Sequence, residues 1–194
     1  MPYFPLFINI EGRRCLVIGG GAVAARKAGA LLEYGARVRI IAPDLSQETA
    51  RLAQREGVEV VRRVYGGIED LRGAALVISA THDVVVNTAV AHDSNELSIP
   101  VNVADVPALC TFYFPALVRR GELSVGFSTS GSCPRLAARF REWLDAQLPA
   151  DSDAALAGLK SERERLMRAG ASEDKIMRIL DAEIDKLLVF SNGA

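Results

Sequence analysis

Cysteine is scarce in this sequence of 194 residues, which contains only Cys15, Cys110 and Cys133. The three are far apart and odd in number, so they match neither the paired spacing of a zinc site nor a disulfide framework. A small fold held together by disulfides is therefore excluded. Such cysteine usage is typical of a reducing compartment, and we expect a cytoplasmic location.

Long hydrophobic runs and an excess of charge are missing as well. No apolar segment is long enough to cross a bilayer, and the opening MPYFPLFINIEG lacks the basic region of a signal peptide. The net charge of −1 gives no electrostatic reason to expect nucleic acid or an anionic membrane as a partner. What remains is an ordinary globular composition, 49% hydrophobic and 24% charged, in a chain long enough for a full core.

The first hundred residues alternate between strand-like and helix-like segments. Short connections between such segments predict an α/β fold with a parallel sheet and right-handed crossovers. The expected strands cover residues 14–18, 37–41, 58–61, 76–80 and 100–103, and the expected helices cover residues 22–34, 46–55 (with Ser46 as its cap) and 83–95.

The pattern changes after Asp105. Two β-rich runs, 112–118 and 123–128, surround Gly121 and predict a hairpin, and Ser132 is expected to cap a helix that Pro149 ends. Two further helices are expected over residues 153–168 and 172–190. The last one carries an apolar stripe that needs a surface, either on a second subunit or on its own chain; the stripe consists of Ile176, Ile179, Leu180, Ile184, Leu187 and Leu188.

Glycines follow the first expected strand and open a helix. The segment Gly19 to Ala24, GGGAVA, matches G-x-G-x-x-A: Gly19 permits the tight turn, Gly21 lets the backbone approach a pyrophosphate, and Ala24 allows close packing of the helix on the sheet. The helix N-terminus offers free N–H groups to that anion. This pattern predicts a dinucleotide site; a glycine turn used only for packing is the alternative.

Three later strand ends carry further candidates. Asp44 follows Pro43 and either holds the adenosine ribose or serves as a turn residue, and the absence of an arginine directly after this strand favours NAD over NADP. Thr81 is a candidate for the nicotinamide side, although Asp83 beside it could simply cap the next helix. Asp105, after the fifth strand, is placed to take a proton, or it is a solvated loop residue.

A hydroxyl-rich loop, STSGSCP, leads into the helix that begins near Pro134. Its helix N-terminus and the nearby Arg119, Arg120 and Arg135 would suit a substrate with many carboxylates. An ordinary N-cap with a solvated helix face explains the same residues.

Several segments together point to one family: YFPLFINIEGRRCLVIGGGAVAARKA, IIAPDLS, SATHD and NVADVPALCTFYFPALVRRGELSVGFSTSGSCPRLAARFRE. In this order, over residues 1–148, the chain resembles the siroheme synthase dehydrogenase–chelatase family. The resemblance implies oxidation of precorrin-2 to sirohydrochlorin with NAD, and in bifunctional members insertion of Fe2+ as a second substrate. It does not decide between the two kinds of member.

The resemblance also implies an architecture and a set of site residues. It divides the chain into a Rossmann NAD-binding domain (1–112), a small β-containing dimerisation and substrate region (113–149) and a helical region (150–194), and it implies a homodimer. Asp105 matches the family's acid/base aspartate. The positions that match the family's cofactor contacts are Gly21, Ala22, Val23, Ala24, Pro43, Asp44, Asn102 and Val103, and Thr129 with the adjacent Ser128 matches its tetrapyrrole side. To these the residues themselves add Gly19 and Thr81 for the cofactor and Arg119, Arg120 and Arg135 for the carboxylates of the substrate.

Two departures from the family stand out. His82 lies where many homologues carry an acidic or amide residue. This histidine either adds a base or an iron ligand, or it has no role. The methyltransferase fused to many bacterial homologues is missing, so we expect a separate enzyme to supply precorrin-2. Outside this family, the glycine loop and the helical tail would also suit a nucleotide-sensing regulatory module without catalysis.

Overall fold

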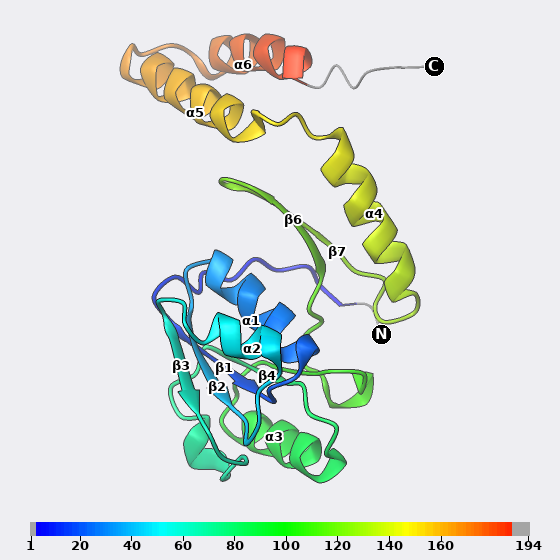
Figure 1. The fold of residues 1–194 in the computed structure, drawn as a ribbon. Coiled ribbons are helices and arrows are strands. Elements are labelled where there is room, and N and C mark those ends of the chain that lie inside the picture. Colours follow the sequence, from blue (N-terminus) through cyan, green and yellow to red (C-terminus); the bar gives the residue numbers. More distant parts are fainter. Residues whose placement is uncertain (1–2, 188–194) are drawn as a thin grey trace. The chain divides into compact units, whose positions relative to one another are not determined.

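The computed structural model describes residues 3–187, and the chain forms two compact units that meet between Phe114 and Pro115. Each unit is described by itself. In the first, a five-stranded parallel sheet has the order β3-β2-β1-β4-β5 (Figure 1). Its strands are β1 (Arg14–Ile18), β2 (Arg37–Ile41), β3 (Val58–Val61), β4 (Leu76–Ser79) and β5 (Val101–Val103).

Two hydrophobic clusters fill the two sides of this sheet. Alternate residues of β1 separate them: Cys15 and Val17 pack with α1, whereas Leu16 and Ile18 pack with α3. The strands that contribute to both clusters, such as β1 (RCLVI) and β4 (LVIS), are rich in Val, Ile and Leu, as expected for strands covered on both faces. The helices of this unit are α1 (Ala22–Glu33), α2 (Gln47–Leu52) and α3 (Val84–Glu96), with the short 3-10 helices η1 (Ile68–Asp70) and η2 (Pro107–Leu109).

The expected Rossmann architecture is confirmed. Because β1 lies between β2 and β4, the chain reverses its direction of winding there, which is where ligands bind in open α/β sheets. The crossover from β3 to β4, which the structure describes throughout, contains only η1. On the sheet face that this crossover passes, helices therefore cover β2 and β3 less than on the opposite face. Charged side chains of β2 and β3 lie there.

The second unit contains a β-hairpin and three helices. Strands β6 (Ala116–Arg120) and β7 (Leu123–Phe127) pair antiparallel around Gly121, whose φ of 56° suits the tight turn. Helix α4 (Pro134–Gln147) packs on the hairpin, where Phe127 stacks on Phe140. Helices α5 (Ser152–Arg168) and α6 (Glu173–Leu187) pack against each other.

Two expectations for this unit need correction. The first hairpin strand begins at Ala116 rather than residue 112, because Pro115 cannot donate a ladder hydrogen bond and Phe112 packs against the core of the first unit. Ser132 does not cap α4. Cys133 occupies the N-cap without a side-chain hydrogen bond, and its N–H donates to the Thr129 hydroxyl.

The apolar stripe of the last helix has a partner within the chain. Ile176 on α6 and Leu166 on α5 are both buried, and Gly170, with a φ of 69°, turns the chain between the two helices. The part of the expected helix over 188–190, including Leu188, lies outside the described residues. None of the described helices is long and apolar enough to cross a membrane.

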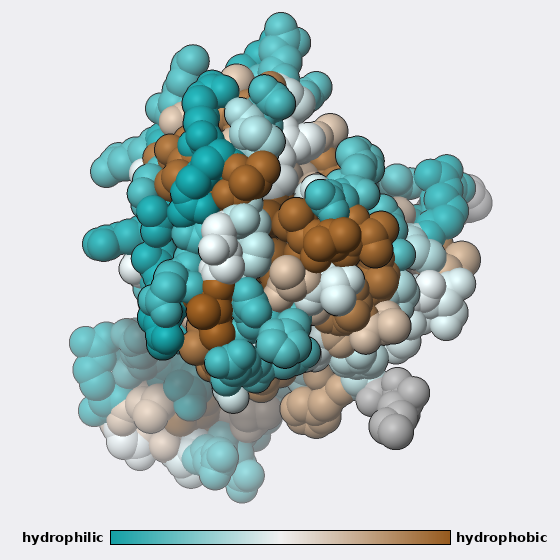
Figure 2. Space-filling model, turned by 90° about the horizontal axis from the view of Figure 1, so that it is seen from below, coloured by the Kyte–Doolittle hydropathy of each residue, from teal (hydrophilic) through white to brown (hydrophobic). Residues whose placement is uncertain are grey.

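Apolar side chains also reach the surface, where Figure 2 shows them among hydrophilic ones on one face. The large exposed ones include Phe4, Leu6, Phe7, Val64, Val84, Val85, Phe140 and Trp143. Those of α4 belong to the second unit and bear on assembly, as described below.

Candidate functional site

The turn between β1 and α1 is built so tightly that two of its glycines have no room for a side chain. A Cβ on Gly19 would lie 2.3 Å from the Ala80 carbonyl oxygen, and Gly19 has a φ of 119°. A Cβ on Gly20 would lie 2.0 Å from the carbonyl oxygen of Asp44. The loop after β1 therefore packs directly on the loops after β4 and β2, and Gly20 is a requirement that the motif did not reveal.

Gly21 differs from its two neighbours. A Cβ built on it meets nothing within 4 Å, its φ is −84°, and it is the N-cap of α1 without a side-chain cap. The first N–H groups of α1 are thus open to a ligand, and the positive end of the helix dipole favours an anion there. Ala22 and Val23 begin the helix at the surface, and the buried Ala24 brings it close to the sheet, as the motif predicted.

Thr49 is a supporting residue that the sequence did not indicate. It is fully buried on α2, and its hydroxyl donates to the carbonyls of Gly20 (2.7 Å) and Gly21 (3.2 Å). Ser46 donates its backbone N–H to Gly20 as well, at 2.7 Å, and caps α2 as expected. Pro43 and Asp44 are exposed beside this loop, so the carboxylate of Asp44 is accessible, and its contact with a ribose stays a prediction.

The loop after β4 is held from α3. The buried Asn87 accepts from the Ser79 hydroxyl at 2.7 Å and donates to the Thr81 carbonyl at 3.0 Å. Asp83 caps α3 by accepting from the N–H groups of Val85 and Val86, so the capping alternative is what the structure shows for Asp83. His82 is exposed in this loop. Among the described residues, no cluster of three or more His, Cys, Asp or Glu side chains could hold a metal ion.

The turn after β5 carries the predicted acid/base residue. Asp105 is exposed and has a φ of 61°, in the left-handed region that aspartate tolerates better than most residues. Such backbone conformations cluster at functional sites. Cys110 holds the end of β5: its thiol donates to the Val103 carbonyl and accepts from the Val103 N–H, both at 3.2 Å.

Asn102 is buried on β5 and lies at the centre of a polar cluster. Its amide nitrogen donates to the Phe112 carbonyl at 3.0 Å, and its amide oxygen accepts from Lys27 Nζ at 2.6 Å. Burial lowers the pKa of Lys27 to about 8, assisted by the charge of Arg26 and opposed by Cys110 and Asp105. Lys27 was not predicted as a site residue. The available signal was its place on the buried stripe of α1, three residues after Ala24 and four before Leu31.

The sheet thus brings the predicted cofactor residues and Asp105 to one edge, at the carboxyl ends of β1, β2, β4 and β5.

The predicted tetrapyrrole residues belong to the second unit, and their exposure and partners differ more than the sequence suggested. Arg120 forms an ion pair with Asp145 of α4, whereas Arg135 is exposed on the first turn of α4. Arg119 donates to the Gly121 carbonyl at 3.1 Å. Ser128 and Thr129 accept backbone N–H groups within their own loop.

Known proteins resemble this chain in sequence and in structure. Residues 6–116 match the family model described as putative NAD(P)-binding. The siroheme synthase of Pseudomonas putida (strain F1) is 46% identical over 149 residues, which are 77% of this chain and 32% of that protein. The siroheme synthase of Stutzerimonas stutzeri (strain A1501) is 39% identical over 184 residues, 95% of this chain and 39% of that protein.

A solved structure titled "SirC, precorrin-2 dehydrogenase" matches with a TM-score of 0.80 and 28% identity, over 98% of this chain and 93% of that one. The two siroheme synthases are much longer than this chain. It spans 32% and 39% of their lengths, whereas it matches almost all of the SirC chain.

Proposed function

Because the chain belongs to the putative NAD(P)-binding family, we propose that it is a dehydrogenase that oxidises precorrin-2 to sirohydrochlorin with NAD, in the biosynthesis of siroheme. The observation that carries this proposal is the likeness to SirC along nearly the whole of both chains. The siroheme synthases named above support the same pathway.

The residues at the carboxyl edge fit a dinucleotide. Gly21 leaves open space over an uncapped helix N-terminus, which suits the pyrophosphate. Asp44 lies beside it for the adenosine ribose, and Thr81, Asn102 and Val103 lie at the neighbouring strand ends for the nicotinamide side. When bound, NAD supplies the hydride acceptor.

Asp105 has the role of base in this proposal. Dehydrogenation removes a hydride and a proton from the substrate, and an exposed carboxylate at the end of β5 can accept the proton. The hydrogen bonds that hold this turn come from Cys110 and the backbone. The carboxylate of Asp105 is therefore available to take the proton from the reacting carbon.

A tetrapyrrole with many carboxylates needs cationic and hydroxyl partners. We propose Arg119, Arg120, Arg135, Ser128 and Thr129 for this task, and Arg120 also forms an ion pair with Asp145. Domain limits at 112 and 149 remain part of the proposal. A reducing, cytoplasmic location suits the free thiols of Cys15, Cys110 and Cys133.

The direct test is an anaerobic assay of the purified chain with precorrin-2 and NAD. We expect NADH and sirohydrochlorin in equal amounts. Tight NAD binding without any turnover or tetrapyrrole binding would instead identify a nucleotide-sensing module. A parallel assay with sirohydrochlorin and Fe2+ decides on iron insertion, since a rate no higher than the uncatalysed one would exclude it.

We further propose a homodimer that uses the exposed face of α4. Leu136, Phe140 and Trp143 lie one helical turn apart and, with Arg139, line a hollow of about 350 Å³. Apolar side chains 46%, 47% and 58% exposed on one helix face are typical of an interface.

Sedimentation tests this assembly. Trp143→Glu should convert a dimer to a monomer, whereas Met177→Glu, an equally drastic change at an exposed position of α6, should not. A Trp143→Glu variant that remains dimeric would remove α4 from the interface. Trp143 is the single tryptophan of the chain, so its fluorescence reports the same transition on dilution.

A further inference from the structure

Lys27 is a half-buried cation that contacts β5, and the proposed reaction has so far given it no role. Its Nζ lies 2.6 Å from the amide oxygen of Asn102 and 4.7 Å from the centroid of the Phe114 ring. A partly buried ammonium needs such partners, since an amide oxygen and an aromatic face together replace part of its lost hydration.

The partner of Lys27 is itself held in one orientation. The amide nitrogen of Asn102 donates to the Phe112 carbonyl, so its oxygen must face Lys27. Asn102 precedes Asp105 by three residues, and Cys110 binds Val103 between them. The amide nitrogen of Asn102 also donates to the Cys110 sulfur at 3.6 Å, so hydrogen bonds connect Lys27 on α1 through Asn102 and Cys110 to Val103, two residues before the proposed base.

The charge of Lys27 also acts on this edge. The groups that face it are Arg26 on its own helix, Cys110 after η2, and Asp105 after β5; Arg26 disfavours the ammonium, and the other two favour it. The ammonium therefore places a positive charge near the turn that bears Asp105. Burial lowers the pKa of Lys27 to about 8, so this charge is lost in mildly alkaline solution.

We propose that Lys27 is a positioning residue for the dehydrogenation: its ammonium fixes the amide of Asn102 and thereby supports the strand end and the turn that bear Asp105. The inference rests on the proposed function. It predicts a dehydrogenase whose activity falls as Lys27 loses its proton, because the charged hydrogen bond to Asn102 is then weakened.

Variants of Lys27 test this in the full chain. For the wild type, we expect kcat to fall on the alkaline side with a midpoint near pH 8. Lys27→Met should have a kcat at least about tenfold lower at neutral pH and no alkaline fall, since no charge remains to be lost. Lys27→Arg should retain part of the activity and move the fall to higher pH, because a guanidinium stays protonated.

Controls separate this role from a structural one. The Kd for NAD should change less than about threefold in Lys27→Met, because Thr49 and Ser46 hold the glycine loop, and the exposed Lys175→Met should match the wild type throughout. Wild-type kcat and an unchanged alkaline fall in Lys27→Met would overturn the proposal.

A second readout does not depend on activity. The acetylation rate of each lysine, followed by mass spectrometry between about pH 6 and 11, gives the midpoint for Lys27, with Lys175 calibrating the reagent. We expect a midpoint near 8 for Lys27 and a higher one in Asn102→Asp, which places a carboxylate beside the ammonium.

An ordinary lysine midpoint for Lys27 would overturn the inference even in an active enzyme. If the wild type forms no NADH, the proposed function fails, and a midpoint near 8 that rises in Asn102→Asp would still establish the Lys27–Asn102 pair. Failure of the reaction and failure of the pair are thus distinguishable.

Discussion

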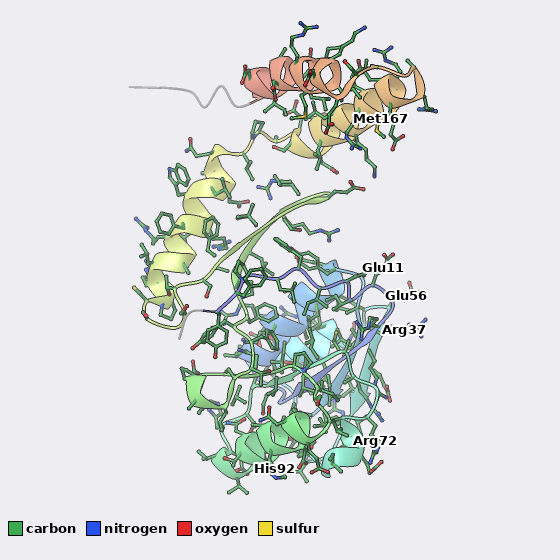
Figure 3. The ribbon with its side chains drawn as sticks, turned by 180° about the vertical axis from the view of Figure 1, so that it is seen from behind. Glu11, Arg37, Glu56, Arg72, His92 and Met167 are labelled. Atoms are coloured by element: carbon green, nitrogen blue, oxygen red, sulfur yellow. The ribbon has the colours of Figure 1, made fainter. Side chains whose placement is uncertain are left out.

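The two edges of the five-stranded sheet both gather charged groups, but only at the carboxyl edge do hydrogen bonds hold the loops around an open, uncapped helix N-terminus. At the amino edge, a hollow of about 580 Å³ is lined by arginine and glutamate side chains together, among them Arg14, Arg37 and Glu56. Figure 3 shows Arg37 and Glu56 near each other, with Glu11 close by. Because the side chains there carry charges of both signs, a single ligand would find few groups of one charge to bind.

At the carboxyl edge, hydrogen bonds hold the loops in place. Gly21 is open, α1 has no side-chain cap, and Asn87, Thr49 and Asn102 hold the surrounding loops by buried hydrogen bonds. The hollow at the amino edge is therefore not where the chemistry is expected. Open N–H groups and an exposed carboxylate on a held turn identify a site better than volume does.

The sharpest test of this contrast is a change of one charge at each edge. Asp105→Asn should lower kcat by about 10²–10⁴, the usual contribution of a general base, with NADH formation as the measurement. Asparagine is chosen because it tolerates the left-handed backbone of this position.

Arg37→Gln changes one charge at the amino edge and should leave kcat within about twofold. If the two variants lose activity equally, the carboxyl edge has no special role.

Two glycines that are adjacent in the chain give a second comparison. Gly21→Ala adds a methyl group to open space, so the thermal midpoint should hardly change, while the affinity for NAD should fall at least about tenfold if the pyrophosphate approaches there. Gly20→Ala should lower both, because its Cβ meets the Asp44 carbonyl. Calorimetry and NAD titration measure the pair, and unchanged NAD affinity in Gly21→Ala would move the dinucleotide elsewhere.

Substitutions in the crossover from β3 to β4, which contains η1, should have a smaller effect, and it concerns stability. Asp70 on η1 is buried and accepts from Arg63 and from the Gly66 N–H, and the Arg63 hydrogen bond is the main reason that the pKa of Asp70 is lowered. Asp70→Asn should reduce the free energy of unfolding by about 1–3 kcal/mol in urea at neutral pH.

The pH dependence follows from the sign of that shift. A carboxyl with a lowered pKa in the folded state stabilises the protein above its unfolded pKa and loses this effect as the pH falls through the folded value. The difference between wild type and variant should therefore shrink below about pH 4. Glu69→Gln, at the exposed ion pair of the same turn, should stay within about 0.5 kcal/mol.

Much of the fold could be predicted because its signals are local. The strand–helix alternation, the cap at Ser46 and the turn at Gly121 depend on neighbouring residues, and the structure confirms them. The predicted start of the hairpin was wrong. Phe112 and Phe114 are residue types that favour strands, but they pack on a core formed by residues far away in the sequence.

The site was harder to predict than the fold. The motif identified the open Gly21 and the buried Ala24, but the contact of Gly20 with Asp44 joins residues more than twenty positions apart, and no pattern indicates it. Thr49, Asn87 and Lys27 were missed for the same reason, since a buried or half-buried polar residue on a helix looks like a surface residue until its partners are known.

The two hydrogen bonds of the Thr49 hydroxyl have one more consequence. They assemble the glycine loop from within the protein, with the backbone of the second crossover packed against the first. A dinucleotide that arrives there finds a rigid cradle and orders little of the chain, so binding loses little conformational entropy. Its affinity can then come from a few backbone N–H groups, and side chains around the ribose and the nicotinamide are left to determine selectivity rather than strength.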